Sequence, residues 1–100
     1  MTTTDIANKI DYSRLPDYMR EGMRLYIEHG VPVGHFLTAV LENNLMEAYG
    51  RADDTNAAAM HEYAAFLYNE APRASHGSRE AVSKWMNQGG LLGLEKKSHD

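Results

Sequence analysis

Apolar side chains recur every three or four positions along most of the chain, which is the spacing of a helix that packs one face on a core. The clearest stripe consists of Leu15, Met19, Met23, Tyr26 and Ile27. Pro16 is tolerated in the first turn of such a helix, whereas Gly30 offers the left-handed position that ends one. Pro32 then prevents the helix from continuing. We therefore predict a helix from about residue 15 to the residue before Gly30.

The middle of the chain predicts the most buried helix and a break after it. Residues 35–42 are apolar around most of the helical circumference, so this segment is expected to lie at the centre of the fold. Asn43 and Asn44 interrupt the helix, because asparagine side chains compete for the backbone hydrogen bonds. One or two further helical turns follow and end before Gly50.

Two more helices are predicted in the second half of the chain. Asp53 is a candidate N-cap, and the helix after it runs to about Glu70, before Pro72. Its predicted apolar residues are Ala57, Met60, Ala64, Leu67 and Ala71 on one face, with Tyr63, Phe66 and Tyr68 beside that face. After a loop, Ser78 caps a last helix, which the Gly89-Gly90 pair ends.

These elements together define a fold class. No segment alternates apolar and polar residues as a strand does, and no segment repeats. The pattern therefore indicates an all-α protein, a compact single-domain bundle of four to five short helices. We expect an N-terminal arm or short helix at 1–14, the helical domain at 15–90 and a C-terminal tail at 91–100.

Three leucines of the predicted tail bear on the oligomeric state. Leu91, Leu92 and Leu94 follow a flexible Gly-Gly pair, and leaving them exposed to water would be unfavourable. They either dock on a neighbouring subunit or fold back on their own core. Our interpretation favours a homodimer.

Charge is spread unevenly over the sequence, although the whole chain carries only −4. Residues 41–70 contain six acidic residues against one cation, Arg51. Nucleic-acid binding normally requires clustered cations that displace counterions, so no direct nucleic-acid partner is predicted. An acidic centre suits a basic protein partner or a head-to-tail self-contact, or is simply a solvated helix face.

Patterns typical of catalysis and metal binding are missing. His61-Glu62 begins a zincin-like pattern, but the second histidine would stand at Ala65. The run 53–56 lacks the glycine and the distal glutamate of a calcium loop. The spacings of a nucleophile elbow do not occur either. We expect no enzymatic activity, no cofactor and no metal.

The sequence also bears on location. Cysteine is absent, and no apolar stretch is long enough to span a bilayer. The first five residues, Met1-Thr2-Thr3-Thr4-Asp5, lack the basic and apolar regions of a signal peptide. The expected location is the cytoplasm, that of the host cell if the protein is phage-encoded, and no membrane partner is expected.

A set of polar residues flanks or interrupts helices that otherwise look buried: Asn43, Asn44, Arg51, Asp53, Asn56 and Asn69. In one interpretation they form a hydrogen-bonded network that closes a corner between helices, with Arg51 paired to Asp53 or to free carbonyls. In the other, they line a pocket that binds a small anionic or nucleotide-like ligand, with Tyr49 or Tyr68 stacking on it. The sequence permits both.

Several blocks of the sequence form a family pattern: Leu15-Pro16-Asp17-Tyr18-Met19-Arg20, Tyr26-Ile27-Glu28-His29-Gly30, Phe36-Leu37-Thr38-Ala39-Val40-Leu41-Glu42-Asn43-Asn44-Leu45, Arg51-Ala52-Asp53, Phe66-Leu67-Tyr68-Asn69-Glu70-Ala71-Pro72, and Gly77-Ser78 with Val82 and Trp85. Over this span the chain resembles a family of small, largely uncharacterised proteins of tailed phages, prophages and other mobile elements. Relatives often carry a second glycine where His35 stands, and an aromatic residue near the position of His76. The resemblance implies a phage accessory protein.

Small non-catalytic phage accessory proteins commonly bind and disable a host factor, or sequester a host signalling molecule. We therefore expect a non-enzymatic, anti-defence protein that binds and inhibits a host defence or regulatory protein. The alternative is a sponge that sequesters a small anionic or nucleotide-type host signalling molecule in a pocket.

Overall fold

The computed structural model describes residues 2–93, and within them the protein contains helices and connectors but no strand. The elements in chain order are α1 (Thr3–Lys9), α2 (Asp17–His29), α3 (His35–Leu41), α4 (Leu45–Arg51), α5 (Asp54–Ala58), α6 (Met60–Asn69), the 3₁₀ helix η1 (Arg73–Ser75) and α7 (Arg79–Gln88), after which 90–93 form a further helical turn. The all-α class is confirmed. The helices are shorter and more numerous than the four to five that we predicted.

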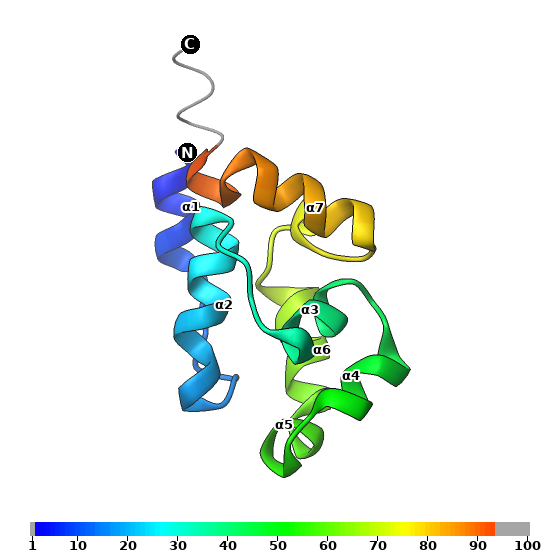
Figure 1. The fold of residues 1–100 in the computed structure, drawn as a ribbon. Helices are drawn as coiled ribbons and strands as arrows, with labels where there is room; N and C mark the ends of the chain where they lie inside the picture. The colour runs from blue at the N-terminus through cyan, green and yellow to red at the C-terminus, as the bar shows by residue number, and fades with distance from the viewer. Residues whose placement is uncertain (1, 94–100) are drawn as a thin grey trace.

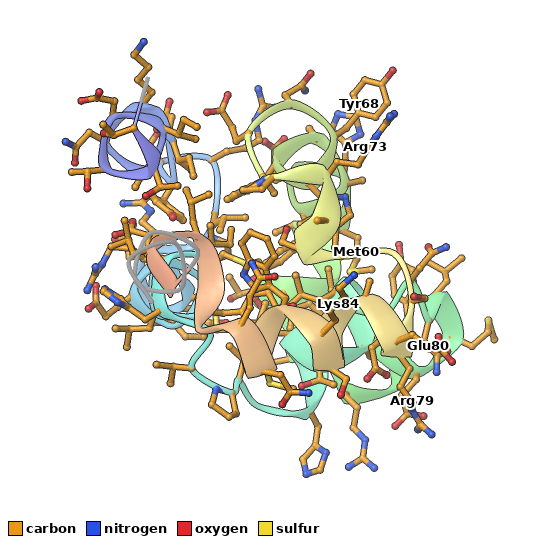
Figure 2. The ribbon with its side chains drawn as sticks, turned by 90° about the horizontal axis from the view of Figure 1, so that it is seen from above. Met60, Tyr68, Arg73, Arg79, Glu80 and Lys84 are labelled. Carbon is orange, nitrogen blue, oxygen red and sulfur yellow. The ribbon has the colours of Figure 1, made fainter. Side chains whose placement is uncertain are left out.

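The helices fall into two groups that α7 connects (Figure 1). α1 and α2 are neighbours on one side of the molecule, in the view of Figure 1 and in the view from above in Figure 2. α3 to α6 form the other side, and α7 runs across one end of both groups. The loop that leads into α7 places η1 against that helix.

α3 lies at the centre of the core, as its sequence predicted. Four of its seven residues are buried: Phe36, Leu37, Ala39 and Leu41. The ring of Phe36 meets that of Tyr63 from α6 edge to face, with the ring centres 5.2 Å apart. The prediction that Asn43 ends this helix is also confirmed, because Asn43 adopts a left-handed conformation with φ of 64°. Asparagine tolerates this conformation better than most residues do.

α2 and the end of α7 approach each other at two glycines. The indole nitrogen of Trp85 donates to the carbonyl oxygens of Tyr26 and Ile27, at 3.1 and 3.2 Å. Beyond this contact, a Cβ atom on Gly90 would lie 2.5 Å from the backbone nitrogen of Gly30. Two backbones therefore touch where neither residue has a side chain.

The core also takes in residues from the two ends of the described chain. Ala7 of α1 is buried, and Ile10 and Tyr12 pack against the core. Leu91 is 5% exposed, and Leu92 packs beside it. Both leucines thus fold back on their own core, while Leu94 lies outside the described residues. The packed unit extends past the 15–90 limits that the sequence suggested.

The single helix predicted from Asp53 to Glu70 is wrong. The chain breaks at Ala59, whose φ of −94° and ψ of 8° depart from helical values and separate α5 from α6. The amide of Ala59 donates to the carbonyls of Thr55 and Asn56, which closes a tight turn.

Of the apolar residues predicted along α6, two aromatic ones are the most buried. The buried side chains of α6 are Tyr63 and Phe66, whereas Met60 and Leu67 are only partly buried. Two aromatic rings remove more apolar surface from water than the alanine-rich stripe does, so they determine which face turns inward. The predicted end of the preceding helix before Gly50 is also wrong, since α4 continues through Gly50 to Arg51.

The loop from α6 to α7 is held by buried hydrogen bonds. Ser75 is fully buried, and its carbonyl oxygen accepts from the hydroxyl of Tyr26 at 2.6 Å. Its own hydroxyl donates to the carbonyl of Pro72 at 2.6 Å. The next residue, His76, is half-buried beside them, and this burial lowers the pKa of its imidazole.

His76 should make the protein less stable as the solution becomes mildly acidic. Because its pKa is lower in the folded chain than its ordinary value of 6.5, the unfolded chain binds more protons there as the pH falls. The free energy of unfolding should therefore decrease from about pH 7 downward, by less than the limit of about 1.4 kcal/mol per pH unit for one proton. Urea titrations at several pH values measure this slope. His76→Gln should flatten it, and an unchanged slope in that variant would contradict the role of His76.

Candidate functional site

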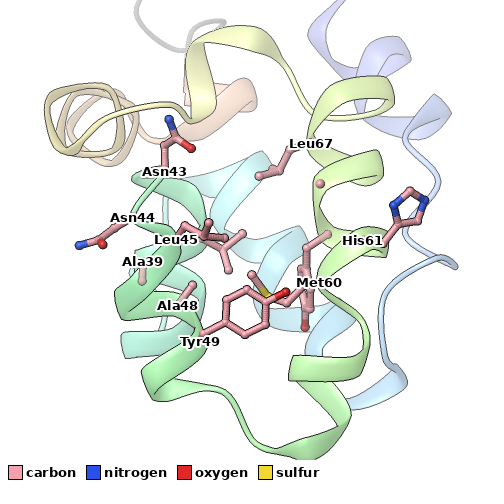
Figure 3. Close-up of a pocket in the computed structure, with 12 residues that line it drawn as sticks. Ala39, Asn43, Asn44, Leu45, Ala48, Tyr49, Met60, His61 and Leu67 are labelled. Atoms are coloured by element: carbon pink, nitrogen blue, oxygen red, sulfur yellow. The ribbon is translucent and has the colours of Figure 1, made fainter.

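An apolar groove of about 400 Å³ lies between the α3–α4 pair and α6 (Figure 3). Its volume falls within the range of about 300–1,000 Å³ that is usual for binding pockets. The lining residues are Ala39, Val40, Asn43, Asn44, Leu45, Ala48, Tyr49, Met60, His61, Tyr63, Ala64 and Leu67. We call this site the α4–α6 groove.

The asparagine pair creates one wall of the groove by turning the chain between α3 and α4. The amide of Asn44 donates to the carbonyl of Ala39 at 2.9 Å, and its side-chain oxygen accepts from the amide of Glu47 at 3.3 Å. Asn44 therefore caps α4. Figure 3 shows its side chain pointing away from the opposite wall. The turn brings α4 back alongside α3, facing α6.

Side-chain size explains why a groove remains between these walls. Three of the lining residues are alanines, Ala39, Ala48 and Ala64, and they cannot reach across the gap. Larger apolar side chains stand at the edge: Leu45 is 60% exposed and Tyr49 is 49% exposed. In Figure 3, Leu45, Tyr49 and Met60 lie on either side of the same opening. The site thus presents apolar surface to solvent.

The groove contains little charge. His61 is its one titratable side chain besides the tyrosines, and Figure 3 shows that this ring points outward from α6. Arg51 is not among the lining residues. Its guanidinium donates to the carboxylate of Glu47 at 2.8 Å on the surface of α4. The predicted pairing of Arg51 with Asp53 or with free carbonyls is therefore wrong, because α4 extends far enough to place Arg51 one turn after Glu47.

Asp53 and Asn56 belong to a separate hydrogen-bonded corner. The hydroxyl of Tyr18 donates to one oxygen of Asp53 at 2.6 Å, and the other oxygen accepts from the amide of Asn56 at 2.7 Å. The side-chain oxygen of Asn56 in turn accepts from the hydroxyl of Tyr63 at 2.6 Å. The bond from Tyr18 lowers the pKa of Asp53, while burial raises the pKa of Tyr63. This corner network ties α2, α5 and α6 together.

The six predicted site residues do not form one pocket. Asn43 and Asn44 lie at the end of the groove, and Asp53 and Asn56 lie in the corner network. Asn69 lines a different, shallow hollow beside α1. Of the two tyrosines considered for stacking, Tyr49 lines the groove, whereas Tyr68 is 89% exposed and does not.

Sequence reasoning missed most of the groove. Met60, Ala64 and Leu67 have the helical spacing that placed them on one face in the sequence, and that face forms one wall of the site. Leu45 followed the asparagine break and gave no separate signal. The sequence did contain one hint. An alanine-rich stripe lies next to a stripe of aromatic residues, which indicates that only one of the two stripes is buried.

The corner network should contribute more to the free energy of unfolding than the ion pair of Arg51 does. Asn56→Ala leaves the buried hydroxyl of Tyr63 without its acceptor, which should lower the free energy of unfolding by about 1–3 kcal/mol. Arg51→Ala removes only an exposed pair on one helix, so we expect a change below about 0.5 kcal/mol. Urea denaturation of both variants measures the difference. Equal losses would mean that Arg51 has a structural role that its contacts do not explain.

Residues 2–93 contain no group of three or more His, Cys, Asp or Glu side chains placed to hold a metal ion. In the same range, no helix has both the length and the apolar character needed to cross a membrane.

No family model, curated protein or solved structure matches the chain. The site must therefore be interpreted from its own geometry.

Proposed function

We propose that this chain is a non-enzymatic accessory protein of a phage or other mobile element, which inhibits a host defence or regulatory protein by binding a segment of it in the α4–α6 groove. The observation that carries the proposal is the apolar surface at the mouth of the groove. The mobile-element context rests on the family resemblance of the sequence. The proposed place of action is the host cytoplasm.

α4 carries a cluster of exposed apolar side chains, and such a cluster is unfavourable in contact with water. Leu45, Met46 and Tyr49 are 60%, 81% and 49% exposed within a single helix of seven residues. Contiguous apolar patches on a protein surface commonly mark a contact with another protein. A groove walled by two helices is also the shape in which an amphipathic helix docks. These features support a protein partner.

Affinity purification from host cells tests the proposal with a matched pair of variants. Leu45→Ser removes an apolar side chain from the groove, and Tyr68→Ser removes one from an exposed part of α6 outside it. Both side chains are exposed, so both variants should fold. We expect the native chain and Tyr68→Ser to recover the same host protein, and Leu45→Ser to lose it. Recovery by all three would place the binding surface elsewhere.

A small ligand is the second candidate, and two features of the groove support it. Tyr49 offers a ring for stacking, and Asn43 offers hydrogen-bonding groups beside a space of about 400 Å³. No lysine or arginine is among the lining residues, so an anionic ligand would lack a cationic partner there. A thermal-shift panel of nucleotides and cyclic dinucleotides tests this alternative. A ligand present at a thousandfold over its Kd adds about 4 kcal/mol to the free energy of unfolding. If no compound of the panel raises the melting temperature, the small-ligand alternative is wrong.

A further inference from the structure

The groove itself indicates what kind of segment it binds, and this inference rests on the function proposed above. The relevant feature is the charge of the helices and connectors that build the site, residues 35–69. They carry five carboxylates and one cation: Glu42, Glu47, Asp53, Asp54 and Glu62 against Arg51.

Two of these carboxylates are neutralised within the protein. Glu47 pairs with Arg51, and Glu62 pairs with Arg14 at 3.2 Å. The remaining three, Glu42, Asp53 and Asp54, form no ion pair among the described residues. The groove-bearing half of the molecule therefore has an uncompensated negative charge.

The positions of the three carboxylates relate to the groove. Glu42 directly precedes Asn43, which lies at the end of the groove where α3 turns into α4. Asp53 and Asp54 follow Ala52, the C-cap of α4, and so lie beyond its opposite end. An apolar surface with acidic residues past both ends of α4 complements a segment that is apolar along one stripe and basic at its ends.

Three cations of the described chain form no ion pair, and they lie outside the lining of the groove. Arg73, Arg79 and Lys84 belong to η1 and α7, and Figure 2 shows Arg73 and Arg79 at the periphery of the molecule. None of the three lines the groove. Within residues 2–93, none of these three cations forms an ion pair with an acidic residue around the site.

We infer that the α4–α6 groove binds an amphipathic helix of net positive charge, with large apolar residues on one stripe and Lys or Arg at its ends. Helical spacing of i, i+3 or i+4, and i+7 spans about 10 Å, which matches the length of a seven-residue helix such as α4. The apolar stripe supplies the contact in the groove. The basic ends of the bound helix lie near the acidic residues past both ends of α4. This complementarity discriminates against acidic helices.

Two synthetic peptides of equal length test the inference by fluorescence anisotropy. Both carry leucine at the stripe positions, with lysine at the other positions in one and glutamate in the other. The full chain should bind the leucine–lysine peptide at least tenfold more tightly than the leucine–glutamate peptide, and the difference should shrink in high salt. Leu45→Ser should weaken binding of the lysine peptide at least tenfold, whereas Tyr68→Ser should leave it unchanged.

Charge variants isolate the acidic contribution. The double variant Glu42→Gln and Asp54→Asn should reduce the preference for the lysine peptide, and it spares Asp53, which caps α5. Equal binding of both peptides, or binding that Leu45→Ser does not affect, would overturn the inference. Self-association that Leu45→Ser abolishes would also overturn it, because a second copy would then occupy the groove. The lysine peptide could fail to bind while the native chain still captures a host protein that Leu45→Ser loses. In that case the inferred basic amphipathic helix is wrong, and the proposed function stands.

Discussion

Gly90→Ala is expected to destabilise the protein by about 2–5 kcal/mol, the combined effect of a left-handed residue and an overpacked contact. Gly90 has a φ of 72°, and an added Cβ would lie 2.5 Å from the nitrogen of Gly30 and 2.6 Å from that of His29. The neighbours are backbone atoms, which cannot rotate away as the end of a side chain would. The end of α7 would have to separate from α2, so Leu91 would lose its packing.

Substitutions at two other glycines distinguish the effect of backbone strain on stability from that of the close backbone contact. Gly77 has a φ of 118° but no neighbour within 4 Å of the added atom, so Gly77→Ala tests the conformational strain alone. Gly50 lies within α4 with no neighbour within 4 Å, and alanine there should stabilise the protein by about 0.5–1 kcal/mol. Thermal and urea unfolding of the three variants measure the contributions. A Gly90 variant no less stable than the Gly77 variant would contradict the close backbone contact.

Phe66→Ala should remove about 3–5 kcal/mol, the usual cost of deleting a buried phenyl ring. Phe66 is fully buried, and its ring meets that of Tyr12 edge to face at 5.4 Å between centres. Tyr12 also donates through its hydroxyl to Glu28 of α2 at 3.2 Å. The substitution therefore weakens the attachment of the N-terminal segment as well as the core of α6.

Tyr68→Ala is the matched control, two residues away on the same helix. Tyr68 is 89% exposed, so its loss should change the free energy of unfolding by no more than about 0.5 kcal/mol. The melting temperature of Phe66→Ala should fall by about 12 °C or more for a domain of this size. Hydrogen exchange should show faster exchange in α1 as well. If α1 keeps its protection while α6 loses it, the N-terminal helix is held by contacts other than the Tyr12 ring.

Helix boundaries could be predicted well wherever a local signal acts on the backbone. Gly30, Ser78 and Gly89 end or begin helices as predicted, and Asp53 caps α5. Such signals depend on a residue and its near neighbours in sequence. The break at Ala59 had no such signal, because alanine is the residue that most favours a continuous helix.

The candidate site was harder to predict, because it depends on which of two apolar faces of α6 turns inward. Tyr63 and Phe66 turn into the core, and the face that carries Leu67 therefore lines the groove. The polar residues that drew attention in the sequence mostly have local structural roles. Asn44 caps α4 and Asn56 accepts the bond from Tyr63. A pattern of residue types alone does not distinguish a cap from a ligand contact.

The indole of Trp85 gives the protein an intrinsic optical probe of one specific event. It is the single tryptophan of the chain, it is 2% exposed, and it does not line the groove. Its emission should therefore shift to the red when α7 detaches from α2 and stay constant when the groove is occupied. Tryptophan fluorescence and labelled-peptide anisotropy can thus follow unfolding and binding as independent signals in one sample.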